Sequence, residues 1–354
     1  MEDFKSVPKL EKRHLTTLDT LRSLAIGAVL MQHSATYYLE SIEASSHIGN
    51  LLQQLSYWNI LVFVMISGYL FLSREIDAAT MWKKYILRIV KCFAIWSCVY
   101  TAYNAAVSYL GGAEVAWILK NCVGDFFLGG TRRMWYLVML IALYAFVPLI
   151  SRLVHHTSER EQRYALLLMG SLAILFPSLR IIHPFETVFG LDVDRMQGVY
   201  ASVYIFYLLF GYWLLSRMEA QGLTRKWNVG IAALGLVSVA LVAIIIVWNN
   251  DVVSSGFVLF VPITALLALL AKSADSFLYT HKIGKMLRSV SQCSFGIYLI
   301  HTAVQYIFLH TGVQESLLRL HPLVGISGYF VLLFCVSWAL IYLLRKCKWV
   351  RDIT

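Results

Sequence analysis

Long apolar runs recur along the whole sequence, and they restrict its fold more than any motif does. A run of about twenty apolar residues is long enough to cross a bilayer as an α-helix. We expect ten such helices, near residues 18–38, 53–73, 92–111, 134–153, 164–180, 200–216, 228–248, 255–272, 291–310 and 323–344. The sequence therefore predicts an all-α polytopic membrane protein, built as a single membrane domain over residues 1–354.

The composition supports this fold class. Of the 354 residues, 59% are hydrophobic and only 14% are charged. A soluble domain usually has roughly a quarter of its residues charged. Because the apolar runs extend along the whole chain, no stretch is left for a separate soluble catalytic domain.

The basic residues predict the orientation of the helices. Cytoplasmic connections of membrane proteins are enriched in Lys and Arg. With both termini in the cytoplasm, only a few Lys and Arg residues lie on the opposite side of the membrane. They are Lys120, Arg132, Arg133, Arg180, Arg195 and Arg319. The net charge of +10 is then a result of topology and gives no indication of nucleic acid binding.

The first apolar run carries two ionisable residues that stand out, Arg22 and His33. Eleven residues on an α-helix bring both side chains to nearly the same face, ~16 Å apart along the axis. Arginine suits phosphate groups, and histidine acts as a general base or an acyl acceptor. Asp19 is placed to pair with Arg22. The alternative is that Arg22 only reaches the inner interface and His33 only bonds a neighbouring helix.

The ninth apolar run holds a continuous polar row. Ser291, Ser294, Tyr298 and His301 follow at spacings of three, four and three residues, and Gln305 extends them. Polar side chains on an apolar helix must face protein or water. This row serves either as hydrogen-bonded contact between helices or as a second wall of the site, with His301 towards His33.

Two other groups of residues are candidates for binding. The cytoplasmic connection WKKYILRIVK carries Lys84, Arg88 and Lys91, which form either a basic rim against lipid headgroups or the mouth for an anionic cytosolic ligand. On the outer side, aromatic and charged residues together suit a saccharide. The candidates there are Trp135, Tyr136, Arg133 and Glu186. An interfacial aromatic belt explains Trp135 equally well.

Glycine-containing segments indicate close helix packing. They are Ser67-Gly68-Tyr69 in FVMISGYLF and the pair Tyr207 and Gly211 in YLLFGY. The sequence has no HExxH, P-loop or GxSxG motif, and its six cysteines show no CxxC spacing. We therefore expect no metal and no nucleotide hydrolysis.

These motifs together resemble a known family. LDTLRSLAIGAVLMQH resembles the LDxLRxxA…H signature of the acyltransferase 3 family of integral membrane acyltransferases, including the spacing of Arg22 and His33. FVMISGYL, WKKYILRIVK, MWYLVMLIALYAFVPLI, YLLFGY and SQCSFGIYLIH resemble its later elements, in the family's order. The chain is most similar to the stand-alone type of the enterobacterial common antigen O-acetyltransferase. It departs from the signature at Ser23, where glycine is usual.

The resemblance implies a function and a site. It implies transfer of an acyl group, usually acetyl from acetyl-CoA, to a hydroxyl of a cell-surface polysaccharide or its lipid-linked precursor, in the bacterial inner membrane. Arg22 and His33 would be the essential pair. Ser67, Tyr298 and His301 would be candidate donors to the thioester oxygen. His33 would either deprotonate the acceptor hydroxyl or carry the acyl group itself. The oligomeric state is open.

Two other functions are compatible with these residues. A transporter or flippase for an anionic or lipid-linked saccharide would also use intramembrane Arg and His. Paired halves with broken helices in matching positions, which many transporters have, are not evident. A sensor or assembly subunit with vestigial chemistry is the third possibility, and the presence of both Arg22 and His33 argues against it.

Overall fold

The computed structural model describes residues 12–43, 46–127, 129, 134–178, 200–220, 222–249 and 258–353. All regular secondary structure in these residues is helical, as the sequence predicted. The described residues fall into two compact units. The first lies within Met1–Leu70 and Arg163–Tyr342, and the second within Phe71–Gln162 and Leu343–Thr354.

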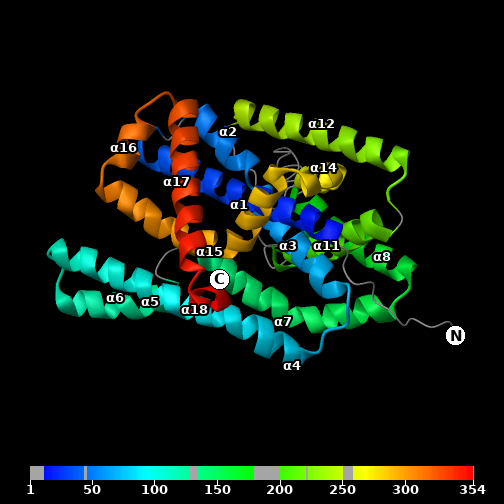
Figure 1. The fold of residues 1–354 in the computed structure, drawn as a ribbon, viewed down its shortest axis with the longest axis horizontal. Coiled ribbons are helices and arrows are strands. Elements are labelled where there is room, and N and C mark those ends of the chain that lie inside the picture. The colour runs from blue at the N-terminus through cyan, green and yellow to red at the C-terminus, as the bar shows by residue number, and fades with distance from the viewer. Residues whose placement is uncertain are drawn as a thin grey trace, which may run out of the picture. The chain divides into compact units, whose positions relative to one another are not determined.

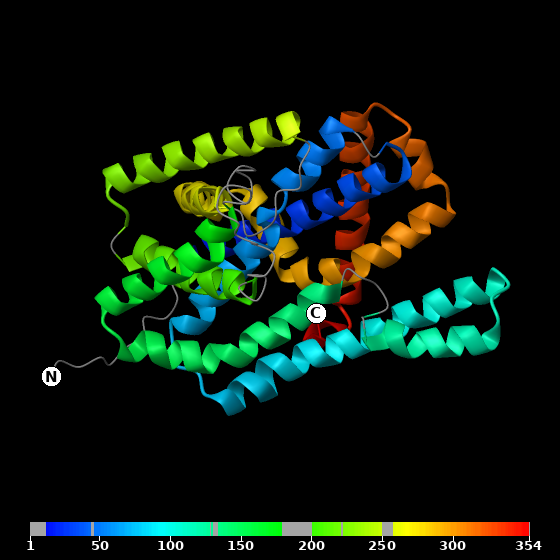
Figure 2. The ribbon, with the colours of Figure 1, turned by 180° about the vertical axis from the view of Figure 1, so that it is seen from behind.

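The helices are drawn in Figures 1 and 2, and by residue range most of them belong to the first unit. In chain order they are α1 (Lys12–Ser41), α2 (His47–Leu55), α3 (Trp58–Leu72), α8 (Glu159–Gly170), the π-helix η3 (Ser171–Leu175), α9 (Phe176–Ser178), α11 (Tyr200–Ala220), α12 (Arg225–Asn249), α13 (Phe260–Ser273), α14 (Asp275–Thr280), α15 (Lys282–His310), α16 (Val313–Leu318) and α17 (Pro322–Leu344). The second unit contains α4 (Ala78–Thr80), the π-helix η1 (Met81–Ile86), α5 (Leu87–Leu110), α6 (Val115–Phe127), α7 (Trp135–His156) and α18 (Lys348–Ile353).

Each of the ten segments expected from apolar composition overlaps helix in the described residues. The expected segment 53–73 is divided into α2 and α3 by a turn at Ser56 and Tyr57, and 164–180 is divided into α8, η3 and α9. Among the described residues, five helical segments are long and apolar enough to cross a membrane: His47–Leu72, Ala78–Leu110, Trp135–His156, Arg225–Val247 and Pro322–Leu344. Helices α1 and α15 are not among the five, because polar side chains along them lower the mean hydropathy. The total of ten crossings and the cytoplasmic termini stay predictions.

The core of the first unit forms where α1, α15 and α17 meet. Its fully buried members include Leu30 on α1, Ile297 on α15 and Tyr329 on α17, and Tyr329 packs its ring edge-on against Phe308 of α15. Besides α15, helix α1 packs against α2, α13 and α14. The first apolar run of the sequence therefore lies at the centre of this unit.

Helices α3 and α11 cross at two glycines. A Cβ atom added to Gly68 would lie less than 3.0 Å from backbone atoms of Leu208, and one added to Gly211 would lie equally close to the backbone of Met65. Small residues let helix backbones approach in this way. Next to the crossing, the Tyr69 hydroxyl donates a hydrogen bond to Glu219 of α11. The sequence prediction that both glycines serve close packing is confirmed.

The second unit is organised by η1, α5 and α7. The ring of Phe71 packs edge-on against Tyr85 and Tyr144, and Ser151 donates to the carbonyl of Arg74 at 2.9 Å. Asp77 caps the helical run that begins at Ala78. Hydrogen bonds from the Thr80 hydroxyl and backbone N–H hold the pKa of the Asp77 carboxyl below its ordinary value.

The glycine crossing gives a test of the fold. Gly211→Ala should lower the free energy of unfolding by about 1–3 kcal/mol, because the new methyl group meets backbone that cannot rotate away. Gly230→Ala on α12 is the matched control, since nothing lies within 4 Å of the added Cβ. It should be neutral or stabilising by up to about 1 kcal/mol through helix propensity. Denaturation of the protein in detergent micelles measures both, and equal effects of the two substitutions would contradict the crossing.

Candidate functional site

The site begins on α1, which runs without interruption from Lys12 to Ser41. Because the helix is continuous, Arg22 and His33 leave it from nearly the same face. Both residues are half-buried, whereas Leu24, on a different face, is exposed. Arg22 and His33 therefore belong to the side of α1 that packs against other helices.

A second histidine meets His33 at the contact between α1 and α15. The rings of His33 and His301 are stacked, with centroids 5.0 Å apart and planes inclined by 20°. His301 is only 1% exposed, and the ring of Tyr298 lies 5.9 Å from it. Residues far apart in the sequence thus form one imidazole pair inside the first unit.

Hydrogen bonding fixes the tautomer of His301. Its Nδ1 lies 2.6 Å from the carbonyl oxygen of Tyr298. A carbonyl oxygen only accepts, so Nδ1 must carry the proton in this bond. Nε2 of the neutral ring then has a lone pair, and the Thr302 hydroxyl lies 3.4 Å from it. The neutral His301 ring is therefore an acceptor at Nε2.

Asp19, near the start of α1, also takes part in the contact between α1 and α15. The Ser291 hydroxyl donates to the carboxylate of Asp19 at 2.6 Å, and the guanidinium of Arg288 lies 3.6 Å from the same carboxylate. The Asp19 side chain is 14% exposed and that of Arg288 is 45% exposed. A carboxylate this deeply placed requires such partners, since burying an unpaired charge is costly.

Ser23 adds a third contact between the two helices. Its hydroxyl lies 2.7 Å from the carbonyl of Leu287 on α15 and 2.8 Å from the carbonyl of Asp19 one turn back. Asp19 and Ser23, near the start of α1, contact residues near the start of α15. His33, further along α1, contacts His301, which is further along α15. Helices α1 and α15 therefore run in the same direction, as alternating crossings require for the first and ninth predicted segments.

A model of known protein families matches this chain over residues 15–342 and is described as an acyltransferase domain. The matched range contains all the contacts between α1 and α15 described above. The chain belongs to the acyltransferase 3 family. Comparison with curated proteins gives no match, and comparison with solved structures gives none either.

Family membership makes this chain a membrane acyltransferase, an enzyme that takes an acyl group from a donor and passes it to an acceptor. Its several apolar helices are those of a multi-pass membrane protein. In the acyltransferase 3 chain described here, the imidazole pair lies at the contact between α1 and α15 of the first unit, and Arg22 is half-buried further towards the start of α1. No group of three or more His, Cys, Asp or Glu side chains suited to a metal ion occurs in the parts of the chain that the structure describes.

The remaining predicted residues have other environments. Ser67 is buried on α3, and its hydroxyl donates to the carbonyl of Phe63 at 3.0 Å on the same helix. In the second unit, the basic residues predicted to bind the donor are exposed on η1 and α5: Lys84, Arg88 and Lys91. Trp135 and Tyr136 begin α7 in that unit, with Trp135 exposed and Tyr136 buried. Arg133 and Glu186 lie outside the described residues.

The sequence analysis missed a polar network beside His33. The amide of Asn59 on α3 donates to Gln32 of α1 at 2.6 Å, and Gln53 of α2 donates to Thr36 of α1 at 2.8 Å. Asn59 is fully buried. Gln32 and Thr36 flank His33 in the sequence, so these bonds orient the segment that carries the imidazole. Amide side chains inside apolar segments were the available signal.

The Asp19 contact can be measured by a double-mutant cycle. Ser291→Ala should lower the free energy of unfolding by about 1–3 kcal/mol, because it removes a hydrogen bond to a charged group. In an Asp19→Ala background the same change should cost far less, since its partner is already gone. Ser273→Ala on α13, whose hydroxyl bonds its own helix, is the control and should be additive with Asp19→Ala. Additivity for Ser291 as well would argue against the contact.

Proposed function

We propose that this chain is an O-acyltransferase of the bacterial inner membrane that moves an acetyl group from acetyl-CoA to a hydroxyl of a cell-surface polysaccharide or its lipid-linked precursor. The observation that carries the proposal is the stacking of His33 on His301. His33 leaves α1 from nearly the same face as Arg22. The family supplies the reaction class, and these residues supply groups with the required chemistry.

The roles follow from charge and reach. The guanidinium of Arg22 binds a phosphate of the donor through paired hydrogen bonds. The helical separation of ~16 Å between Arg22 and His33 is comparable to the length of a pantetheine arm. A donor phosphate held at Arg22 therefore brings the thioester close to His33. In the second unit, the exposed basic residues of η1 and α5 are a separate group whose positive charge suits an anionic ligand.

The reaction balances with one histidine. His33 takes the proton from the acceptor hydroxyl as its oxygen attacks the thioester carbonyl carbon. A C–O bond forms, the C–S bond breaks, and His33 returns the proton to the sulfur, which leaves as the thiol of CoA. His301 holds the His33 ring by stacking. Because its Nδ1 is engaged by the Tyr298 carbonyl and its ring stacks on His33, we assign His301 a positioning role.

The first test uses protein in lipid nanodiscs, supplied with acetyl-CoA and a lipid-linked amino sugar. His33→Ala should reduce release of CoA at least about 100-fold, the usual contribution of a general base. Arg22→Ala should raise the KM for acetyl-CoA about 10- to 100-fold, because it removes a hydrogen bond to a charged group. Leu24→Ala, on the exposed face of the same helix, is the control and should behave as the wild type.

Two results would contradict the assignment. Normal acylation by the His33→Ala protein would remove His33 from the chemistry. Movement of the saccharide across the membrane with no turnover of acetyl-CoA would identify a transporter instead.

The second test concerns His301. His301→Phe keeps an aromatic ring against His33 and should retain kcat within about threefold, whereas His301→Ala should lower kcat about three- to tenfold, the value of an aromatic contact. The KM for acetyl-CoA should not change in either variant, because Arg22 is untouched. If His301→Phe is as inactive as His33→Ala, a second imidazole takes part in proton transfer, as transfer through an acyl-histidine would require.

A further inference from the structure

A polar cavity lies between α5 and α6 of the second unit, apart from the residues assigned above. The two helices pack side by side as a hairpin (Figures 1 and 2). The cavity has a volume of about 110 Å³. Its walls carry amide, hydroxyl, carboxylate and indole groups, from Asn104 and Ser108 on α5 and from Trp117, Asn121 and Asp125 on α6.

The polar groups of this cavity are held in place by two hydrogen bonds. The amide of Asn104 donates to the carboxylate of Asp125 at 3.2 Å, which joins α5 to α6. The amide of Asn121 donates to the carbonyl of Trp117 at 2.8 Å, one turn back on α6. A carboxylate has about four acceptor sites and an Asn side chain has both donor and acceptor atoms. Asn121 and Asp125 therefore have atoms suited to further hydrogen bonds with a ligand.

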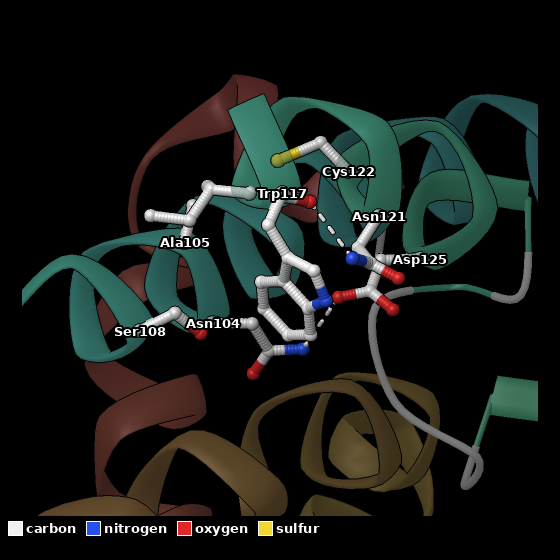
Figure 3. Close-up of a pocket in the computed structure, with 8 residues that line it drawn as sticks. Asn104, Ala105, Ser108, Trp117, Asn121, Cys122 and Asp125 are labelled. Atoms are coloured by element: carbon white, nitrogen blue, oxygen red, sulfur yellow. Dashed lines mark hydrogen bonds between the residues drawn. The ribbon is translucent and has the colours of Figure 1, made fainter. Parts of the chain in front are cut away.

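The aromatic wall is the indole of Trp117. Figure 3 shows its ring beside the hydrogen bond that joins Asn104 of α5 to the carboxylate of Asp125, with Asn121 close by. The residue is 55% exposed, so a ligand can reach the ring. An indole face offers apolar area and an electron-rich surface at little entropic cost. The C–H face of a pyranose ring is complementary to such a surface.

The chemistry of the walls argues against an anion and against a lipid tail. A phosphate or other anion would be repelled by Asp125, and a lipid tail would leave the amides without partners. A tryptophan of an interfacial belt needs no surrounding amide and carboxylate groups. A neutral polyhydroxylated ring suits both the polar groups and the aromatic wall of the cavity. Its hydroxyls can bond the amides and the carboxylate, while its C–H face covers the indole.

We propose that the α5–α6 cavity is a saccharide-binding subsite that holds one sugar ring of the acceptor, an inference that rests on the proposed function for its biological role. Its volume is well below the roughly 300–1,000 Å³ of pockets that engulf a ligand. The subsite therefore holds part of a single ring while the rest of the saccharide stays exposed. The α5–α6 connection also falls on the outer side in the topology predicted from Lys and Arg.

The test measures sugar binding without any acyl donor. Protein in nanodiscs, free of alkyl glycoside detergent, is mixed separately with methyl α-D-glucopyranoside, methyl β-D-galactopyranoside and N-acetyl-D-glucosamine. Saturation-transfer difference NMR should show transfer from the wild-type protein to at least one of them. Trp117→Ala should reduce this transfer about fivefold, and Trp117→Phe should keep most of it, because a phenyl ring preserves the stacking face.

The control is Leu119→Ala, on the same helix but 65% exposed and away from the cavity, which should bind as the wild type does. Equal thermal stability of the Trp117 and Leu119 variants excludes unfolding as the cause of a loss. Absence of transfer from all three sugars, or equal transfer in the wild type and Trp117→Ala, would overturn the subsite.

His33→Ala separates the subsite from the proposed function. It should bind the sugars as the wild type does, since it leaves α5 and α6 unchanged. Sugar binding without any acetyl-CoA turnover in the wild type would overturn the acetyltransferase and support the subsite. Acetyl-CoA turnover by the wild type, with an acceptor KM that Trp117→Ala leaves unchanged, would support the acetyltransferase and overturn the subsite.

Discussion

Polar side chains on α1 and α15 need one another, because apolar surroundings offer no water to replace a missing partner. Asp19 is met by Ser291 and Arg288, and His33 is met by His301. These contacts lie at two levels along helices that run in the same direction. They fix which faces of α1 and α15 meet, and the positions of Arg22 and His33 follow from that.

Apolar and glycine contacts surround this polar seam and have a different effect. The cluster shared by α1, α15 and α17 includes Leu30 and Val304, which lie one turn from His33 and His301 on the same helices. The crossing of α3 and α11 at Gly68 and Gly211 brings the two backbones together where a larger side chain would not fit. Tight packing of this kind resists small displacements. A site that depends on the position of two imidazole rings benefits from such rigid surroundings.

The candidate site is also where the chain departs from an ordinary membrane pattern. Helices α1 and α15 fall short of the apolar character of the five clear candidate spans. Local departures from the rules of a fold are expected at functional positions. In this family member the departure consists of Asp19, Arg22 and His33 on one helix and Ser291 and His301 on the other. Their polarity weakens the membrane signal, and the proposed function assigns the chemistry to His33 and Arg22 among them.

The sequence by itself determined the helical class and the shared face of Arg22 and His33, because these depend on local periodicity and on residues of one helix. Only the tertiary structure decided that His301 stacks on His33, that Asp19 bonds Ser291 and Arg288, and that Asn59 supports Gln32. Those contacts join residues far apart in the chain, and periodicity shows which face of a helix is polar but not which helix it meets. The cavity beside Trp117 has the same origin, since it exists only where α5 and α6 pack together.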